Sequence, residues 1–188
     1  MIKSDLHLDR DGEVDEIRTV DRARSGDRDA QEVLVRRYGA DVYAVALRIL
    51  GDRDQAADAA QDAMINALNG LGRFRGEASF RTWILRIAAN SAKSVGRRGW
   101  RKREVALTTA DNVVAATQDP ESRALLRDEA ARAGRLLERL PPKQRMAVHL
   151  RINQGLSFAE AGEVMDCTEG AARVNYHLGI KRLRELLT

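Results

Sequence analysis

Cationic side chains gather between Arg97 and Arg103, where five of seven residues are lysine or arginine. Only Gly99 and Trp100 interrupt this segment, which we call the basic cluster. Guanidinium and ammonium groups at such density suit a polyanion, and phosphate groups of a nucleic acid are the obvious candidate. Trp100 lies among the cations, where an indole ring is suited to stacking on a base.

A second cationic group lies near the C-terminus, on a predicted helix that begins after Thr168. Helical spacing places four residues on its outer face: Arg173, His177, Lys181 and Arg184. Its inner face is expected to comprise Ala172, Tyr176, Ile180, Leu183 and Leu187. A shorter helix precedes it, with Ser157 and Glu160 at the spacing of a capping box. Two helices joined by so short a turn are typical of a helix-turn-helix, although many two-helix corners bind no DNA.

A third group is acidic and lies on one side of a helix predicted to follow Asp52. We call it the acidic ridge, and it consists of Asp54, Asp58, Gln61 and Asp62. No lysine or arginine lies nearby on that side of the helix. The charge pattern alone favours a solvated helix face over a binding surface.

Residues suited to catalysis or metal binding are scarce. The chain has one cysteine, Cys167, and three histidines, which supply neither an intrachain disulfide nor a cysteine-rich zinc site. We expect Cys167 to be a small buried residue in the turn and His149 to be structural or on the surface. No clustered carboxylate-histidine set and no phosphate-binding loop occurs, so we expect no catalytic residue, no metal and no cofactor.

The composition favours an all-α protein. Hydrophobic residues make up 44% of the 188 residues and charged residues 32%, whereas aromatic residues reach only 4%. The formal net charge is only +4, because acidic segments flank the basic cluster. No apolar run approaches the length of a membrane span, and the charged start lacks a signal-peptide core. We therefore expect a cytoplasmic protein.

Hydrophobic periodicity and caps place the helices. The first is expected from about Val14 to Gly26 and the second over 27–50, with its buried side made of Ala30, Val33, Leu34, Tyr38, Val42, Val45, Ala46 and Ile49. The helix after Asp52 buries mainly alanines. Ser79 is a plausible cap for a further helix, whose polar stripe is expected to comprise Thr82, Arg86, Asn90, Lys93 and Arg97.

Between the basic cluster and Pro120 the sequence has no sustained period, and we interpret it as a linker. The expected organisation is an N-terminal extension with the start of the first helix (1–24), a first helical domain (25–103), a linker (104–120) and a second, smaller helical domain (121–188). In the second domain a stripe of Leu126, Ala130, Ala133, Leu137 and Leu140 is expected to end at Pro141.

The combination of these features is more specific than each alone. The segments FRGEASFRTWILRIAAN, LPPKQR and GLSFAEAGEVMDCTEG, in this order, closely resemble the extracytoplasmic-function (group IV) sigma factors of bacterial RNA polymerase. The resemblance runs from about Ser25 to the C-terminus. It implies two helical domains, sigma regions two and four, joined by a flexible linker.

The resemblance also implies roles for residues of the first domain. In the family, the helix that matches the acidic ridge binds the clamp helices of the largest polymerase subunit. The resemblance therefore implies that Asp58, Gln61 and Asp62 bind core polymerase here. The loop before the next helix captures a base flipped from the minus-ten element, and unstacking that base costs a few kcal/mol. The implied minus-ten residues are Phe74, Arg75, Gly76, Glu77, Ser79, Asn90, Lys93, Arg97 and Arg98, the last three as phosphate contacts.

For the second domain the resemblance implies recognition of the minus-thirty-five element and contact with the polymerase flap. The matching residues are Arg173, Val174, Asn175, His177 and Lys181. Here the chain departs from the family, which often has Thr-Val-Lys-Ser-Arg where this sequence has Ala-Ala-Arg-Val-Asn. Val174 lacks a hydroxyl and Asn175 lacks a charge, so the preferred promoter sequence is not implied.

The implied function is therefore a sigma factor for a stress-type promoter class, without catalytic activity. It binds core polymerase and promoter DNA, and an anti-sigma factor is expected to hold it inactive. A free-standing helix-turn-helix regulator is the alternative, but it leaves the acidic ridge and the FRGEASF loop without a role. A third hypothesis is a nucleic-acid enzyme, but the sequence contains no cluster of catalytic residues that would support it.

Overall fold

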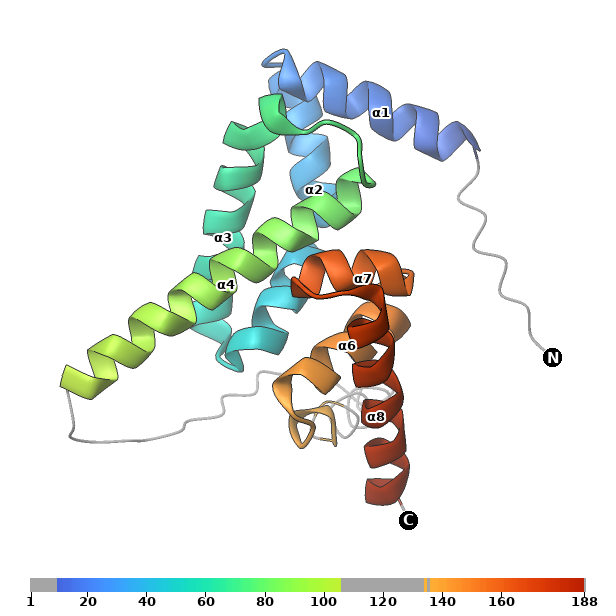
Figure 1. The fold of residues 1–188 in the computed structure, drawn as a ribbon. Helices are drawn as coiled ribbons and strands as arrows, with labels where there is room; N and C mark the ends of the chain where they lie inside the picture. The colour runs from blue at the N-terminus through green and yellow to red at the C-terminus, as the bar shows by residue number, and fades with distance from the viewer. Residues whose placement is uncertain (1–9, 106–133, 135, 188) are drawn as a thin grey trace, which may run out of the picture. The chain divides into compact units, whose positions relative to one another are not determined.

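The computed structural model describes residues 10–105, 134 and 136–187, and every regular element among them is helical. In chain order these are α1 (Arg10–Arg24), α2 (Arg28–Leu50), α3 (Arg53–Gly70), the 3₁₀ helix η1 (Leu71–Arg73), α4 (Phe80–Val105), α6 (Pro142–Ile152), α7 (Phe158–Met165) and α8 (Glu169–Leu187) (Figure 1). The all-α fold expected from the composition is thus confirmed. None of the described helices is long and apolar enough to cross a membrane.

The chain divides into two compact units, Met1–Ala92 and Lys93–Thr188, with the division inside α4. The predicted linker lies almost entirely outside the described residues, as do Leu126, Ala130 and Ala133 of the expected apolar stripe. The domain boundaries expected from the sequence therefore stay a prediction.

The first unit begins with α1 and α2, which meet at a tight turn. Gly26 has a φ of 92°, a conformation that glycine adopts without steric cost. The Asp27 carboxylate accepts hydrogen bonds from the backbone N–H groups of Asp29 and Ala30 and caps α2. Arg22 of α1 donates to the same carboxylate, with 2.8 Å between Nε and Oδ2. The first helix begins at Arg10, four residues before the predicted start.

The pKa of Asp27 is lowered from its ordinary value, first by the Ala30 N–H and next by the Arg22 guanidinium. A carboxyl whose pKa falls on folding adds stability above its unfolded pKa, and this stability is lost as the pH falls through the folded pKa. Asp27→Asn removes the charge but keeps an equally good cap. We expect the variant to melt below the parent at pH 7, with the difference shrinking as the pH falls below the ordinary aspartate pKa of about 3.9. Thermal melts followed by circular dichroism measure this; a constant difference would contradict it.

α2 and α3 form the antiparallel core pair of this unit (Figure 1). Gly51, with a φ of 70°, ends α2, and the Asp52 carboxylate caps α3 by accepting from the Gln55 N–H at 2.8 Å. The buried residues of α2 are Ala30, Leu34, Tyr38, Val42, Val45 and Ala46, and those of α3 are Ala56, Ala59, Ala63 and Ala67. The expectation for Val33 was wrong: its side chain is 48% exposed, because it lies at the margin of the buried stripe.

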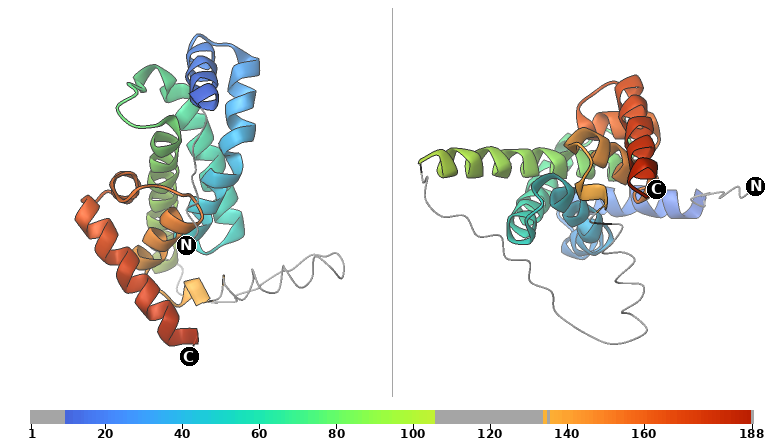
Figure 2. Two further views of the ribbon diagram at one scale, coloured as in Figure 1. Left: turned by 90° about the vertical axis from the view of Figure 1, so that its right-hand side faces the viewer. Right: turned by 90° about the horizontal axis from the view of Figure 1, so that it is seen from below.

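α4 crosses α2 obliquely and begins at a cluster of aromatic rings (Figures 1 and 2). Ser79 caps it, as predicted, by accepting from the Thr82 N–H at 3.1 Å. Thr82 itself was wrongly assigned to the polar stripe, since it is 0% exposed. Its hydroxyl lies 2.9 Å from the Ser79 hydroxyl, so its burial leaves a hydrogen-bonding partner in place. Leu85 and Ala89 are buried as well, so the buried arc is wider than the face on which the apolar residues Phe80, Ile84, Ile87 and Ala88 recur at helical spacing.

The second unit packs α6, α7 and α8 together (Figure 2). The predicted capping box is present: Ser157 and Glu160 exchange side chain to backbone hydrogen bonds at the start of α7. Asp166 takes the left-handed conformation after α7, and the Thr168 hydroxyl accepts from the Ala171 N–H to cap α8. The predicted helix-turn-helix is confirmed.

Three expectations for this unit can be compared with the structure. Cys167 is exposed rather than buried, because it lies in a turn that projects its side chain outward. Leu187 is 66% exposed rather than inward, since it lies in the last turn of α8, beyond the helices that cover the rest of that face. His149 is buried, which agrees with a structural role, and its Nδ1 lies 3.3 Å from the side-chain amide oxygen Oδ1 of Asn153.

Candidate nucleic-acid interface

The acidic ridge is a continuous exposed face of α3. Asp54, Asp58, Gln61 and Asp62 are all exposed, on the side of the helix away from its buried alanines. Ile65 continues the same face one turn later and is 49% exposed. Small alanines hold α3 close to its neighbour, so the ridge stands on a rigid helix. An exposed acidic face that carries one large apolar residue is suited to a basic protein partner with an apolar contact of its own.

The loop between η1 and α4 is anchored at its start and exposed at its tip. The Phe74 ring lies 5.4 Å from the Phe80 ring and 5.3 Å from the Trp83 ring, and Phe80 contacts Tyr38 of α2. This aromatic cluster fixes where the loop leaves the helical core. We therefore assign Phe74 to the anchor of the loop, whereas the sequence interpretation counted it among the DNA contacts.

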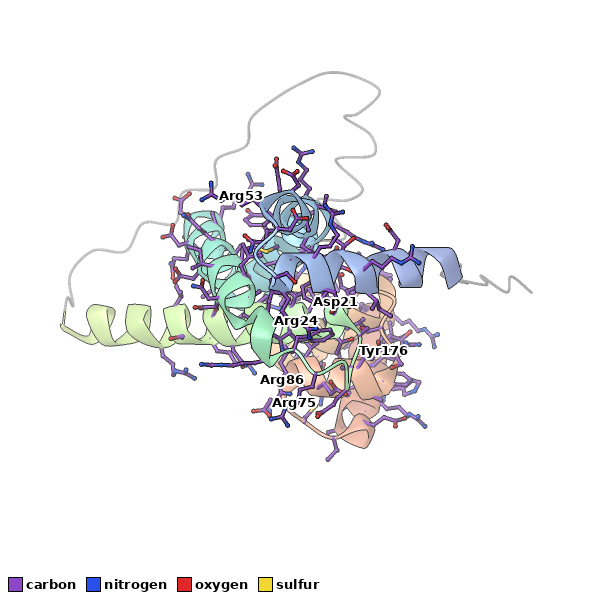
Figure 3. All side chains as sticks on the ribbon, turned by 90° about the horizontal axis from the view of Figure 1, so that it is seen from above. Asp21, Arg24, Arg53, Arg75, Arg86 and Tyr176 are labelled. Atoms are coloured by element: carbon purple, nitrogen blue, oxygen red, sulfur yellow. The ribbon has the colours of Figure 1, made fainter. Side chains whose placement is uncertain are left out.

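The tip of the loop consists of Arg75, Gly76 and Glu77, all exposed. Gly76 has a φ of 73°, so the turn at the tip depends on glycine. Arg75 and Glu77 approach each other only to 4.0 Å with side chains more than three-quarters exposed, an arrangement that stabilises little. Both side chains can therefore reorient toward a ligand. Arg75 extends from the loop into its surroundings (Figure 3).

Beyond the loop, α4 presents polar side chains in helical register. Arg86, Asn90 and Arg97 are exposed, and Lys93 is half-buried. Arg86, labelled in Figure 3, was part of the predicted stripe but not of the predicted site. Its spacing of four residues from Asn90 puts it one turn earlier on the same face of the helix. It belongs to this surface. For Arg98 and the rest of the basic cluster the structure describes only the helical backbone, so their side chains lie outside the described residues.

The outer face of α8 carries the other predicted DNA contacts. Arg173, Val174, His177 and Lys181 are exposed, as the helical spacing predicts. Val174 is 57% exposed, and exposed Leu178 lies one turn further on. Asn175 differs, because its amide donates to the Ala171 carbonyl of its own helix at 2.8 Å and is partly buried. Arg173 pairs with Glu169 at 2.5 Å. Arg184, the fourth residue predicted on this face, is exposed as well, so the surface offers three cationic side chains, an imidazole and an apolar strip.

Within the described part of the chain no histidine, cysteine or carboxylate side chains are grouped so that they could hold a metal ion. The chemistry that the described surfaces offer is recognition: one acidic face, one aromatic-anchored loop and two cationic helix faces. Together with the helix-turn-helix, they define an all-helical protein built to bind a nucleic acid.

Two family models match the chain and together cover most of it. "Sigma-70 region 2" matches residues 34–102 and "Sigma-70, region 4" matches residues 130–183. The RNA polymerase sigma-H factor of Pseudomonas aeruginosa is 36% identical in an alignment 163 residues long that covers 82% of this chain and 84% of that protein. The ECF RNA polymerase sigma-E factor of Escherichia coli K12 is 35% identical over the same lengths. The chain therefore belongs to the sigma-70 family and, within it, to the extracytoplasmic-function (ECF) sigma factors.

Solved structures agree with the fold. The sigma factor RpoE of Bartonella quintana, solved in complex with the anti-sigma factor NepR, has a TM-score of 0.68 at 22% identity, over 83% of this chain and 95% of that one. CnrH, solved in complex with the cytosolic domain of CnrY, has a TM-score of 0.67 at 24% identity, over 92% of this chain and 96% of that one. The family resemblance noted from the sequence is confirmed.

Proposed function

We propose that this sigma factor binds core RNA polymerase in the cytoplasm, directs it to one class of promoters and nucleates strand opening, without catalytic activity of its own. The observation that carries the proposal is the coexistence, in one chain that matches both sigma regions, of an exposed acidic ridge and two exposed cationic helix faces. A DNA-binding regulator needs the cationic faces but has no need of the ridge.

The ridge residues Asp58, Gln61 and Asp62 are proposed to bind the clamp helices of the largest polymerase subunit. Their exposure on a rigid helix supports this role, and the second domain is proposed to contact the flap. Acidic side chains arranged along one face steer a basic partner and set its register.

Promoter contacts are proposed on both units. Arg75, Gly76, Glu77 and Ser79 would form the pocket for a flipped minus-ten base, with Phe74 anchoring the loop. Asn90 would flank that pocket, and Arg86, Lys93, Arg97 and Arg98 would hold phosphates. On α8, Arg173, Val174, His177 and Lys181 would reach the minus-thirty-five element; we place Asn175 at its margin because its amide already bonds its own helix.

An anti-sigma factor is proposed as the regulator of this chain. Two proteins of the same fold were solved with a partner bound: the sigma factor RpoE with the anti-sigma factor NepR, and CnrH with the cytosolic domain of CnrY. A partner that covers the ridge and the cationic faces together would block both polymerase and promoter, which suits a stress-responsive switch.

Run-off transcription tests the proposal directly. Purified protein is added to core polymerase on templates whose start sites were mapped after forced expression of the chain. We expect transcripts only when both proteins are present, and no tight binding to the promoter duplex by the chain alone. Tight binding without polymerase, together with no transcript in its presence, would instead support a free-standing regulator.

A further inference from the structure

Phe158 occupies an unusual place in the second unit. It is the first residue of α7, next to the Ser157 cap, and its ring is only half-buried. The Arg151 guanidinium lies over this ring, 4.5 Å from its centroid, and that of Arg173 lies over it at 5.1 Å. Both distances fall in the range of cation–π attraction. One aromatic ring therefore holds two arginines from two different helices.

The same ring also contacts the aromatic side chains of α8. Its centroid lies 5.5 Å from that of Tyr176 and 6.1 Å from that of His177, and the two α8 rings lie 5.3 Å apart. Arg173 and His177 are two of the proposed promoter contacts. Phe158 thus contacts both of them from the first helix of the helix-turn-helix.

Each of the two guanidinium groups also has a polar partner. Arg151 donates to the Leu156 carbonyl, just before α7, and Arg173 pairs with Glu169. An exposed arginine loses considerable side-chain entropy when it is fixed for bidentate contact with a base. A guanidinium already resting on a ring and oriented by a carboxylate loses less of that entropy on binding, which favours selective contact.

We propose that Phe158 is a positioning residue for promoter selection: its ring holds the Arg173 guanidinium and the His177 ring in the orientation that reads the minus-thirty-five element. This inference rests on the proposed function of α8. Phe158 makes no base contact itself, and it acts through the π-face of its ring rather than through its bulk.

The test uses the full chain with core polymerase and a set of promoters in which each minus-thirty-five base pair is changed in turn. Arg173→Ala identifies the base pairs that depend on Arg173. We expect Phe158→Leu, which keeps an apolar side chain but no ring, to lower discrimination at those same base pairs by roughly two- to fivefold. Phe158→Tyr keeps the π-face and is expected to retain the parent's discrimination.

A double-mutant cycle separates positioning from general damage. The effects of Phe158→Leu and Arg173→Ala should be non-additive, because removal of the guanidinium leaves the ring nothing to position. Lys181→Ala is the matched control: it removes another exposed cation of α8 that does not touch Phe158, and its effect should add to that of Phe158→Leu. Additive effects in both cycles would overturn the proposal.

An NMR measurement covers the case in which Phe158→Leu fails to fold. In the unmodified protein, the Nε–Hε signals of Arg151 and Arg173 should show the ring-current shifts of groups held over a ring. The signal that disappears in Arg173→Ala is that of Arg173. Signals at free-arginine positions would overturn the proposal. If Arg173→Ala changes selection and Phe158→Leu does not, only the positioning role fails; if Arg173→Ala changes nothing, the proposed role of Arg173 fails with it.

Discussion

Reversing the charge of Asp58 should strongly weaken the binding of this chain to core RNA polymerase while leaving its fold intact. Asp58 is exposed on the acidic ridge, between Asp54 and Asp62 on the same helix face. A lysine there faces the basic partner with a like charge, and loss of charge complementarity within an interface costs several kcal/mol. We expect Asp58→Lys to weaken polymerase binding by roughly 100-fold or more at low salt.

A second charge reversal in the same unit is the control. It tests whether a loss of binding comes from lost stability or from any charge reversal, regardless of its position. Glu32 is also acidic and exposed, and pairs with Arg36 on α2, away from the ridge. Because exposed substitutions usually change stability by about 0.5 kcal/mol or less, both variants should melt close to the parent. Glu32→Lys should bind polymerase as the parent does.

Two titrations with labelled core polymerase, at low and high salt, complete the comparison. Salt screens exposed charges, so the difference between Asp58→Lys and the parent should shrink as salt rises. Equal affinity of Asp58→Lys, Glu32→Lys and the parent at low salt would show that the ridge does not bind polymerase. The solvated-face interpretation, which the charge pattern alone favoured, would then hold.

Local signals in the sequence predicted most of the fold. Short polar residues at helix starts, glycines at helix ends and the Ser157 to Glu160 spacing act over one turn of chain, and the structure contains the caps they predict. The start of α1 was placed late because no cap or apolar stripe marks it. Local chemistry therefore fixes the number and approximate bounds of the described helices.

Burial was predicted less well, because it depends on what covers each helix. A helical wheel assumes one buried face, but α4 is covered over a wider arc that includes Leu85 and Ala89. Thr82 is buried since the Ser79 hydroxyl provides it with a partner, which periodicity does not encode. For Leu187 the error is the opposite: it was predicted to be buried but is exposed, because the last turn of α8 extends beyond the helices that pack against it.

In the candidate site, too, features set within one helix were predicted and contacts between helices were not. Helical spacing correctly placed Arg173, His177 and Lys181 on one exposed face, and it placed the acidic ridge on another. It did not predict that Phe158 would lie against Arg173, because that contact joins two helices through the geometry of the turn between them. The exposure of these side chains is established, whereas their contacts with DNA and polymerase stay predictions.

Replacing Gly179 by leucine should disrupt the second unit, and with it promoter selection. Gly179 is buried on the inner face of α8, where α8 packs on α6. A Cβ atom there would lie 2.7 Å from Cγ2 of Val148 and 3.2 Å from the Gln144 carbonyl oxygen. Val148 is itself buried and has little room to move. Overpacking of this kind destabilises the folded state. For a leucine side chain we expect the free energy of unfolding to fall by about 3 kcal/mol or more.

Gly170 provides the matched control in the same helix. A Cβ at that position meets no atom within 4 Å, and the residue is exposed in the first turn of α8. Gly170→Leu therefore adds the same side chain without a clash, and a gain in helix propensity of up to about 1 kcal/mol accompanies it. Hydrogen exchange distinguishes the two variants, since it reports each helix separately.

Exchange should accelerate in α6 and α8 of Gly179→Leu and stay at the parent's rate in α2 and α3, because the clash is confined to the second unit. In the same variant, transcription from promoters that depend on the minus-thirty-five element should fall, while polymerase binding through the acidic ridge persists in part. Gly179→Ala adds a single carbon, and better helix propensity offsets part of its clash, so its effect should be smaller. If Gly179→Leu exchanges like Gly170→Leu throughout α6 and α8, then close packing at this glycine does not hold the DNA-reading helix in place.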